Sequence, residues 1–112
     1  MPDRLEATFE ALADPARLAM VRLLRKKPRR STEIAAALEM PRPTTSRHLE
    51  VLRMAGLVEA SLLRDDARAR LYQLKRERFS QLRRFLDEVE AYWGDQLQAF
   101  KGHAEGKYRR RS

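Results

Sequence analysis

The chain has 112 residues and a mass of 13.1 kDa, which fits one domain and excludes most multidomain enzymes. Its 24 Lys and Arg outnumber 16 Asp and Glu, and the net charge of +8 favours a polyanionic partner such as nucleic acid or an anionic membrane surface. Because cysteine is absent, disulfides, thiolate nucleophiles and cysteine-containing metal sites are excluded. No apolar run approaches the roughly 20 residues of a membrane span, so we expect a soluble, cytoplasmic protein with no membrane partner.

Hydrophobic spacing predicts two helices before residue 28. Leu5, Phe9 and Leu12 follow the helical period and predict a first amphipathic helix over 3–12. Asp14 followed by Pro15 signals the start of a second helix, because Asp is a favoured N-cap and Pro tolerates the first helical position. This helix ends at residues 26–28, and the residues expected to face inward are Leu18, Val21, Leu23 and Leu24.

Two further helices are predicted around a break at residues 39–42. Ser31 is expected to cap the third helix, over 31–38, with Glu33 in its first turn. The fourth helix, over 43–55, begins at Pro43, a residue that favours extended backbone at Arg42. It is expected to end at Gly56 in the left-handed conformation. Its inward-facing residues are Thr45, Leu49 and Leu52.

After Gly56 the periodicity changes from helix to strand. Residues 57–63 and 69–74 read as two strands of a hairpin around a polar turn at 64–68. A long helix then covers 77–101, with apolar residues spaced by three and four positions. The tail 102–112 is basic and is expected to be disordered, which makes residues 1–101 the folded domain.

The positive charge is concentrated in the middle of the chain. Residues 25–48 contain seven Lys and Arg and two Glu, whereas residues 77–100 contain three Arg and five acidic residues. Scattered charge would only solvate exposed faces. Clustering in one window instead favours a binding surface for a polyanion.

These elements predict a mainly α fold with a small β-hairpin, which is the winged helix-turn-helix. The second helix of such a pair enters the major groove of DNA, where hydroxyl and guanidinium groups reach base edges and phosphates. Residues 42–48 supply these groups, with Arg47 and Thr44 as the first candidates for reading bases. The candidate DNA-binding residues are Arg30, Ser31, Arg42, Thr44, Thr45, Ser46, Arg47, His48, Arg64, Arg68 and Arg70.

Residues 5–75 resemble the ArsR family of bacterial winged-helix repressors, above all in the segments ALADPAR at 11–17 and SRHLEVLRMAGLV at 46–58. The resemblance implies a homodimeric repressor that an effector releases from its operator. Three features depart from the family: Glu39 replaces the usual turn glycine, Pro41 and Pro43 flank the start of the recognition helix, and the wing loop is longer. The first and last helices are expected to form the dimer interface through Leu5, Phe9, Leu82, Leu86, Val89, Trp93 and Phe100.

The metal sites of the family lack their ligands in this chain. The third-helix site needs two cysteines, and residues 30–34 contain none. In the best register the last-helix site retains only Asp87 and His103, and His48 stands alone among the recognition residues. We therefore expect no metal, no cofactor and no thiol-based sensing, while the effector stays open.

Three functions compete on the sequence alone. The first is a sequence-specific dimeric repressor of an inverted repeat. The second is an architectural or non-specific DNA-binding protein, which the basic middle and tail would also suit. The third is a winged helix used as a protein-interaction module. An enzyme is not expected, because the chain has no Gly-rich phosphate loop, no cysteine and no paired catalytic carboxylates.

Two features of the last helix also allow other interpretations. Its apolar stripe over 79–100 would serve either as ordinary core packing or as a dimer interface, and its length favours the dimer. Phe85, Tyr92 and Trp93 would line an effector pocket or form interface core, and the spacing favours the interface.

Overall fold

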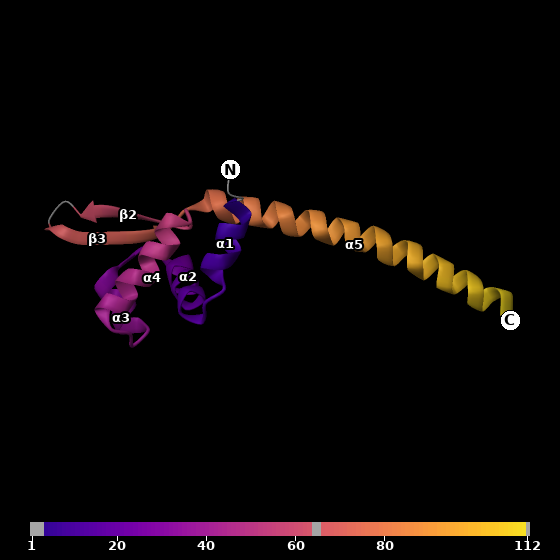
Figure 1. The fold of residues 1–112 in the computed structure, drawn as a ribbon, viewed down its shortest axis with the longest axis horizontal. Coiled ribbons are helices and arrows are strands. Elements are labelled where there is room, and N and C mark those ends of the chain that lie inside the picture. Colours follow the sequence, from indigo (N-terminus) through magenta and orange to yellow (C-terminus); the bar gives the residue numbers. More distant parts are fainter. Residues whose placement is uncertain (1–3, 64–65, 112) are drawn as a thin grey trace. The chain divides into compact units, whose positions relative to one another are not determined.

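The computed structural model describes residues 4–63 and 66–111, with side chains described for 4–62 and 70–102 (Figure 1). The chain divides into two compact units, residues 1–80 and 81–112. The first unit holds helices α1 (Arg4–Leu12), α2 (Pro15–Lys26), α3 (Ser31–Ala37) and α4 (Arg42–Met54) and strands β1 (Arg29–Arg30), β2 (Val58–Leu63) and β3 (Asp66–Leu74). Helix α5 (Arg76–Arg111) begins in the first unit and makes up the second.

The small sheet has three antiparallel strands in the order β1-β3-β2. The predicted hairpin is present as β2 and β3, in which Ala60 pairs with Tyr72 and Ser61 with Leu71. Strand β3 starts at Asp66 and not at residue 69, so part of the predicted turn is strand. Strand β1 was not predicted, and it adds Arg29 opposite Tyr72 on the other edge of β3.

The core of the first unit lies where the helices meet the sheet. The predicted inward stripe of α4 is confirmed, because Thr45, Leu49 and Leu52 are all buried. In α2 the prediction is partly wrong: Met20 is fully buried, whereas Leu18 is 37% exposed. Truncating a core leucine such as Leu49 or Leu52 to alanine typically lowers the free energy of unfolding by about 2–5 kcal/mol. The buried apolar cluster consists of Ala11, Met20, Leu24, Ile34, Leu49, Leu52, Leu57 and Val58.

The helix-turn-helix consists of α3, α4 and the turn between them. Its limits are set by the residues at the ends of α2, α3 and α4. Asp14 caps α2 as predicted, and Pro15 is its first residue. Ser31 is the first residue of α3 and not its cap, because Arg30 before it is extended in β1. Helix α4 begins at Arg42, one residue before the predicted start, so the expectation of an extended Arg42 is wrong. Pro41 has the extended backbone instead and occupies the N-cap position, while Gly56 ends the segment with φ of 78°.

The second unit is helical from residue 81 to Arg111. Helix α5 continues through the segment that was expected to be a disordered tail and ends at Arg111. Large exposed apolar side chains in this unit are Leu86, Tyr92, Trp93, Leu97 and Phe100. No helix among the described residues is both long and apolar enough to span a membrane.

Candidate nucleic-acid interface

The outward side of α4 carries the predicted recognition residues. Arg42, Ser46 and Arg47 are exposed, and Thr44 is half-buried. The opposite side of the same helix is buried through Leu49 and Leu52. Because the inner side anchors the helix in the core, the guanidinium and hydroxyl groups at its N-terminal half are held outward at fixed spacing.

Thr45 does not belong to this outward set, although the sequence analysis included it among the DNA-binding candidates. It is 1% exposed, and its Oγ1 donates a hydrogen bond to the carbonyl oxygen of Pro41 at 3.0 Å. The carbonyl of Pro41 also accepts the backbone N–H of Thr45 at 2.9 Å. Thr45 therefore stabilises the first turn of α4 from inside.

His48 is half-buried and connects α4 to the beginning of α2. Its Nδ1 lies 3.2 Å from Nη1 of Arg17. His48 lies on α4 as predicted from the sequence, whereas Arg17, which stands 31 residues earlier, was not predicted as part of the site. No periodicity indicates such a long-range contact, although the Asp14-Pro15 start signal correctly placed Arg17 in the first turn of α2.

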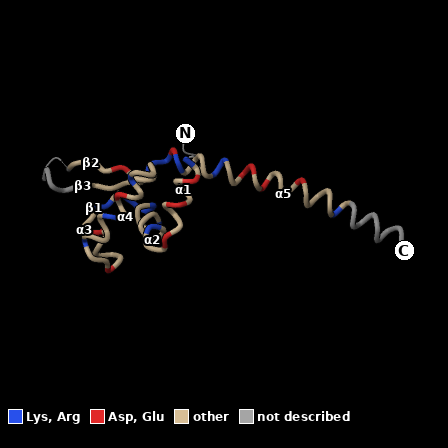
Figure 2. Tube along the Cα trace, viewed as in Figure 1, with Lys and Arg blue, Asp and Glu red and all other residues tan. Residues whose placement is uncertain are grey.

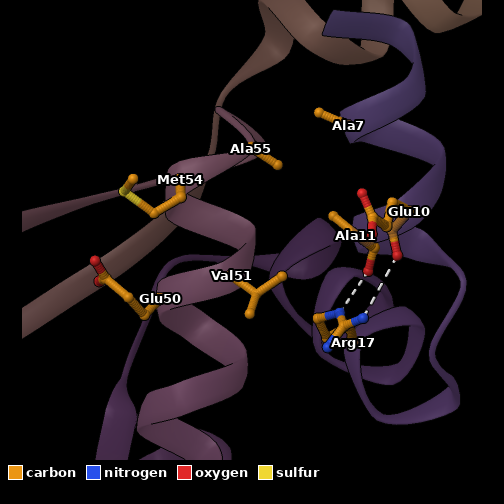
Figure 3. Close-up of a pocket in the computed structure, with 8 residues that line it drawn as sticks. All are labelled: Ala7, Glu10, Ala11, Arg17, Glu50, Val51, Met54 and Ala55. Atoms are coloured by element: carbon orange, nitrogen blue, oxygen red, sulfur yellow. Dashed lines mark hydrogen bonds between the residues drawn. The ribbon is translucent and has the colours of Figure 1, made fainter. Parts of the chain in front are cut away.

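Arg17 is in turn fixed by the end of α1, as Figure 3 shows. Its Nε donates to the carbonyl oxygen of Ala11 at 2.6 Å, and its Nη2 donates to that of Glu10 at 3.4 Å. Carbonyls in the last turn of a helix have no partner within the helix, so the guanidinium supplies a donor to the Ala11 carbonyl. The Glu10 carbonyl also accepts the backbone N–H of Ala13 at 3.3 Å. The side chain thereby links α1 and α4 from its position on α2.

The start of α2 carries a charged cap beside this link. One Asp14 carboxylate oxygen accepts the backbone N–H of Ala16 at 2.8 Å and that of Arg17 at 3.2 Å. The hydrogen bond from the Arg17 backbone is the main cause that lowers the pKa of Asp14 below its usual value of 3.8. The Ala16 N–H and the positive charge of Arg17 act in the same direction.

A groove with a volume of about 500 Å³ lies beside Arg17 (Figure 3). Its wall is mainly apolar, and its polar members are Glu10, Arg17 and Glu50. The apolar lining residues come from α1 and from the C-terminal part of α4 together with Ala55 after it, and they are Ala7, Ala11, Val51, Met54 and Ala55.

Basic residues precede α3, as Figure 2 shows for the segment around β1. Arg30 is exposed, and its backbone N–H donates to the Glu33 carboxylate at 3.1 Å. Ser31 is half-buried. Arg29 is half-buried too, and its Nε has no hydrogen-bond partner among the described residues.

The wing is the hairpin of β2 and β3, and its described side chains include one of the predicted DNA-binding arginines. Arg70 is exposed on β3 opposite Leu62. The side chain of Arg68, whose backbone belongs to β3, and the whole of Arg64 lie outside the described residues.

An ion pair on α4 faces the same space as Arg70. A polar hollow with a volume of about 470 Å³ is lined by Arg70, Ser61, Glu50 and Arg53. Arg53 donates to both Glu50 carboxylate oxygens, at 3.0 and 2.6 Å, and this pairing lowers the pKa of Glu50 and raises that of Arg53. Arg53 was not predicted as part of the site, because a helical Glu and Arg three positions apart usually form a solvated pair.

The residues expected at a dimer interface differ in exposure. On α1, Leu5 is half-buried and Phe9 is 43% exposed. On α5, Leu82 and Val89 are half-buried. The other predicted interface residues of α5 are exposed, namely Leu86, Trp93 and Phe100. Within the described parts of the chain, no three His, Asp or Glu side chains are grouped so as to hold a metal ion.

Comparison with known proteins identifies the family. The model of the family described as bacterial regulatory protein, arsR family, matches residues 14–60. An uncharacterized HTH-type transcriptional regulator from Methanocaldococcus jannaschii is 39% identical over 71 residues, which are 62% of this chain and 75% of that protein.

Solved structures agree with the sequence matches. An ArsR-like transcriptional regulator from Rhodococcus sp. RHA1 has a TM-score of 0.74 at 26% identity, over 88% of this chain and 90% of that one. The homodimeric winged helix-turn-helix DNA-binding domain of a possible ArsR-family regulator from Mycobacterium bovis has a TM-score of 0.63 at 29% identity, over 80% of each chain. The matches cover the elements from the α2 cap to the wing, and the chain therefore belongs to the ArsR family of bacterial regulatory proteins.

Proposed function

We propose that this protein is a homodimeric, sequence-specific DNA-binding transcriptional repressor that reads an inverted-repeat operator with α4. The observation that carries the proposal is the two-sided character of this helix. Thr45, Leu49 and Leu52 are at most 1% exposed, while Arg42, Ser46 and Arg47 face outward. A helix anchored so firmly on one side and polar on the other suits insertion into the major groove.

In this proposal the side chains divide into base readers and phosphate contacts. Arg47 and Thr44 read base edges, because a guanidinium pairs with guanine O6 and N7 and a hydroxyl reaches several acceptors. Arg42 precedes them and Ser46 lies between them in the first half of α4. Arg30 and Ser31 contact phosphates beside the helix-turn-helix, and the wing arginines Arg64, Arg68 and Arg70 contact the neighbouring backbone.

Dimerisation places two recognition helices on one operator. The similar Mycobacterium bovis domain is described as homodimeric. In this chain α5 carries Leu86, Trp93, Leu97 and Phe100 on helical spacing, each about half exposed or more. Exposed apolar side chains in such a row favour burial against a second copy, together with Leu5 and Phe9 of α1. A repressor of this kind acts in the cytoplasm, where bacterial DNA lies, and performs no catalytic step.

The proposal is tested by the affinity of an Arg47→Ala variant for DNA selected from a random pool. If Arg47 reads a guanine, the loss is about 1–3 kcal/mol, or roughly 5- to 150-fold in Kd on the selected site. Fluorescence anisotropy at fixed salt measures it for the selected site and for a scrambled one.

An Arg22→Ala variant is the matched control, because Arg22 is an exposed arginine on α2, outside α4 and the wing. We expect this variant to bind like the parent. Equal losses for Arg47→Ala on selected and scrambled DNA would make Arg47 a phosphate contact, and a parent without preference for any sequence would overturn the proposed function.

A further inference from the structure

We propose that Arg17 is a positioning residue that fixes the neutral ring of His48 with its proton on Nε2, so that His48 donates this N–H to DNA. The inference rests on the proposed DNA-binding function of α4 and extends it to a residue outside the helix-turn-helix. Its starting point is the 3.2 Å contact between Nη1 of Arg17 and Nδ1 of His48.

The chemistry of the two groups decides the direction of this hydrogen bond. A guanidinium has five N–H donors and no acceptor, and it keeps its charge in proteins. Arg17 must therefore donate, and Nδ1 of His48 must accept with its lone pair. A neutral imidazole carries one proton, so in this arrangement the proton resides on Nε2.

Arg17 is held firmly enough to impose this choice. Its Nε and Nη2 donate to the carbonyl oxygens of Ala11 and Glu10 (Figure 3). Its backbone N–H donates to Asp14, which caps the start of α2. The guanidinium thus has two further anchors, both on α1, and rotation away from His48 would break them. Orientation of a histidine by a hydrogen bond at its second nitrogen is the usual way in which proteins select a tautomer.

His48 lies on the helix that carries the proposed DNA-reading residues. It lies four residues after Thr44 on α4, so the two side chains share one edge of the helix, and both are half-buried. Nδ1 faces Arg17, and Nε2 lies on the far side of the ring. Its N–H is a suitable donor for an acceptor on DNA, either a phosphate oxygen or a base edge.

The tautomer is measured first, in the absence of DNA. The chain is labelled with ¹⁵N-histidine and studied at about pH 8, where neutral imidazole predominates, and a His103→Gln variant assigns the signals. We expect a protonated Nε2 and an unprotonated Nδ1 at His48, and a mixture of tautomers in Arg17→Met. A parent spectrum with the proton on Nδ1, or one that Arg17→Met leaves unchanged, would overturn the proposal.

The second measurement asks whether Arg17 acts through His48. Arg17→Met should weaken DNA binding roughly three- to tenfold, as expected for one hydrogen bond, and should have no further effect in a His48→Ala background. Arg22→Met, a matched change of another α2 arginine, should leave affinity unchanged. If Arg17→Met weakens binding equally in both backgrounds, Arg17 only supports the fold, and the positioning role is wrong.

Replacement of His48 itself separates the two possible acceptors on DNA. The His48→Gln amide can offer an N–H near the place of Nε2 and should retain most of the affinity, whereas His48→Asn should not. Loss of affinity by His48→Asn on all DNA assigns the contact to a phosphate, and loss only on the selected site assigns it to a base. A parent that binds no DNA would overturn the proposed function and the DNA contact together, while the NMR result still decides whether Arg17 sets the tautomer.

Discussion

Glu39 closes the turn between α3 and α4 with a left-handed backbone, φ 50°. The turn holds it there, because the N–H of Glu39 donates to the Ala36 carbonyl at 3.3 Å and that of Met40 to the Ala35 carbonyl at 2.9 Å. In this region the Cβ of an L-residue approaches the following carbonyl oxygen, which costs about 1–2 kcal/mol. The resemblance to the ArsR family implied glycine here, and the structure supplies the physical reason.

The first prediction concerns this turn. Glu39→Gly should raise the free energy of unfolding by up to about 1 kcal/mol, because glycine relieves the steric cost but adds freedom to the unfolded chain. In a thermal melt this corresponds to a rise of roughly 4–8 °C in Tm for a domain of this size. Glu39→Ala is the control, since alanine keeps its Cβ. A gain with alanine equal to that with glycine would contradict backbone strain as the cause.

The capping carboxylate of Asp14 gives a second residue-scale prediction, with a defined pH dependence. The pKa of Asp14 is lowered in the folded state, chiefly by the backbone N–H of Arg17, so its contribution to stability is present above its usual pKa of 3.8. That contribution is lost as the pH falls through the lower pKa of the folded state. Asp14→Ala should therefore be less stable than the parent at neutral pH, and the difference should shrink in acid.

Urea unfolding at a series of pH values measures this effect. Asp14→Asn serves as the control, because its amide oxygen can still accept the N–H groups of Ala16 and Arg17 without a titrating charge. We expect a smaller loss for Asn than for Ala at neutral pH. If the Asp14→Ala difference stayed constant down to pH values well below 3.8, the charged cap would not be the source of the stability.

At the level of elements, helix ends are the features that sequence predicts best. Asp14 with Pro15 and Gly56 each meet a local backbone requirement that a short segment reveals by itself. Strand β1 has no such signal, because a strand of two arginines shows no alternation and depends on pairing with Leu71 and Tyr72 far along the chain. The early start of α4 has a similar cause, since Pro41 and Pro43 are both compatible with a first turn.

In the candidate site, too, local features could be predicted from the sequence and long-range contacts could not. The outward position of Arg47 and the burial of Leu49 follow from helical periodicity alone. The sequence context of Thr45 allowed two roles, a place in the inward-facing stripe of α4 and a contact to DNA. Its burial in the folded chain favours the inward-facing role. The contact between Arg17 and His48 is tertiary, so it was beyond any local pattern.

The apolar row on α5 gives the prediction at this scale. Leu97→Lys should shift the chain from dimer to monomer, because a charge in the centre of the row would be desolvated on association. Sedimentation equilibrium measures the mass. Asp95→Lys is the control, since residue 95 lies on another side of the helix from Trp93 and Leu97. A Leu97→Lys variant that retains the parent mass would contradict this interface.

For the whole molecule, the charge distribution separates a DNA-binding region from a region suited to dimerisation. The net charge of +8 is not spread evenly, because the middle of the chain, residues 25–48, is strongly basic. Helix α5 carries both signs over its described side chains, as Figure 2 shows. Its charged residues from 81 to 102 are Arg83, Arg84, Lys101, Asp87, Glu88, Glu90 and Asp95. A helical segment that is close to neutral, as residues 81–102 are, suits association with a second copy, and a basic helix-turn-helix suits DNA.

The central property proposed for the molecule is that two copies of α4 read two half-sites of a specific DNA sequence. Footprinting of the full chain on DNA selected from a random pool tests it most directly. We expect protection of an inverted repeat whose half-sites are centred about 34–36 Å apart, or roughly one helical turn, and loss of this pattern with Arg47→Ala but not Arg22→Ala. Protection that varies only with salt and DNA length, without a repeated sequence, would contradict the account.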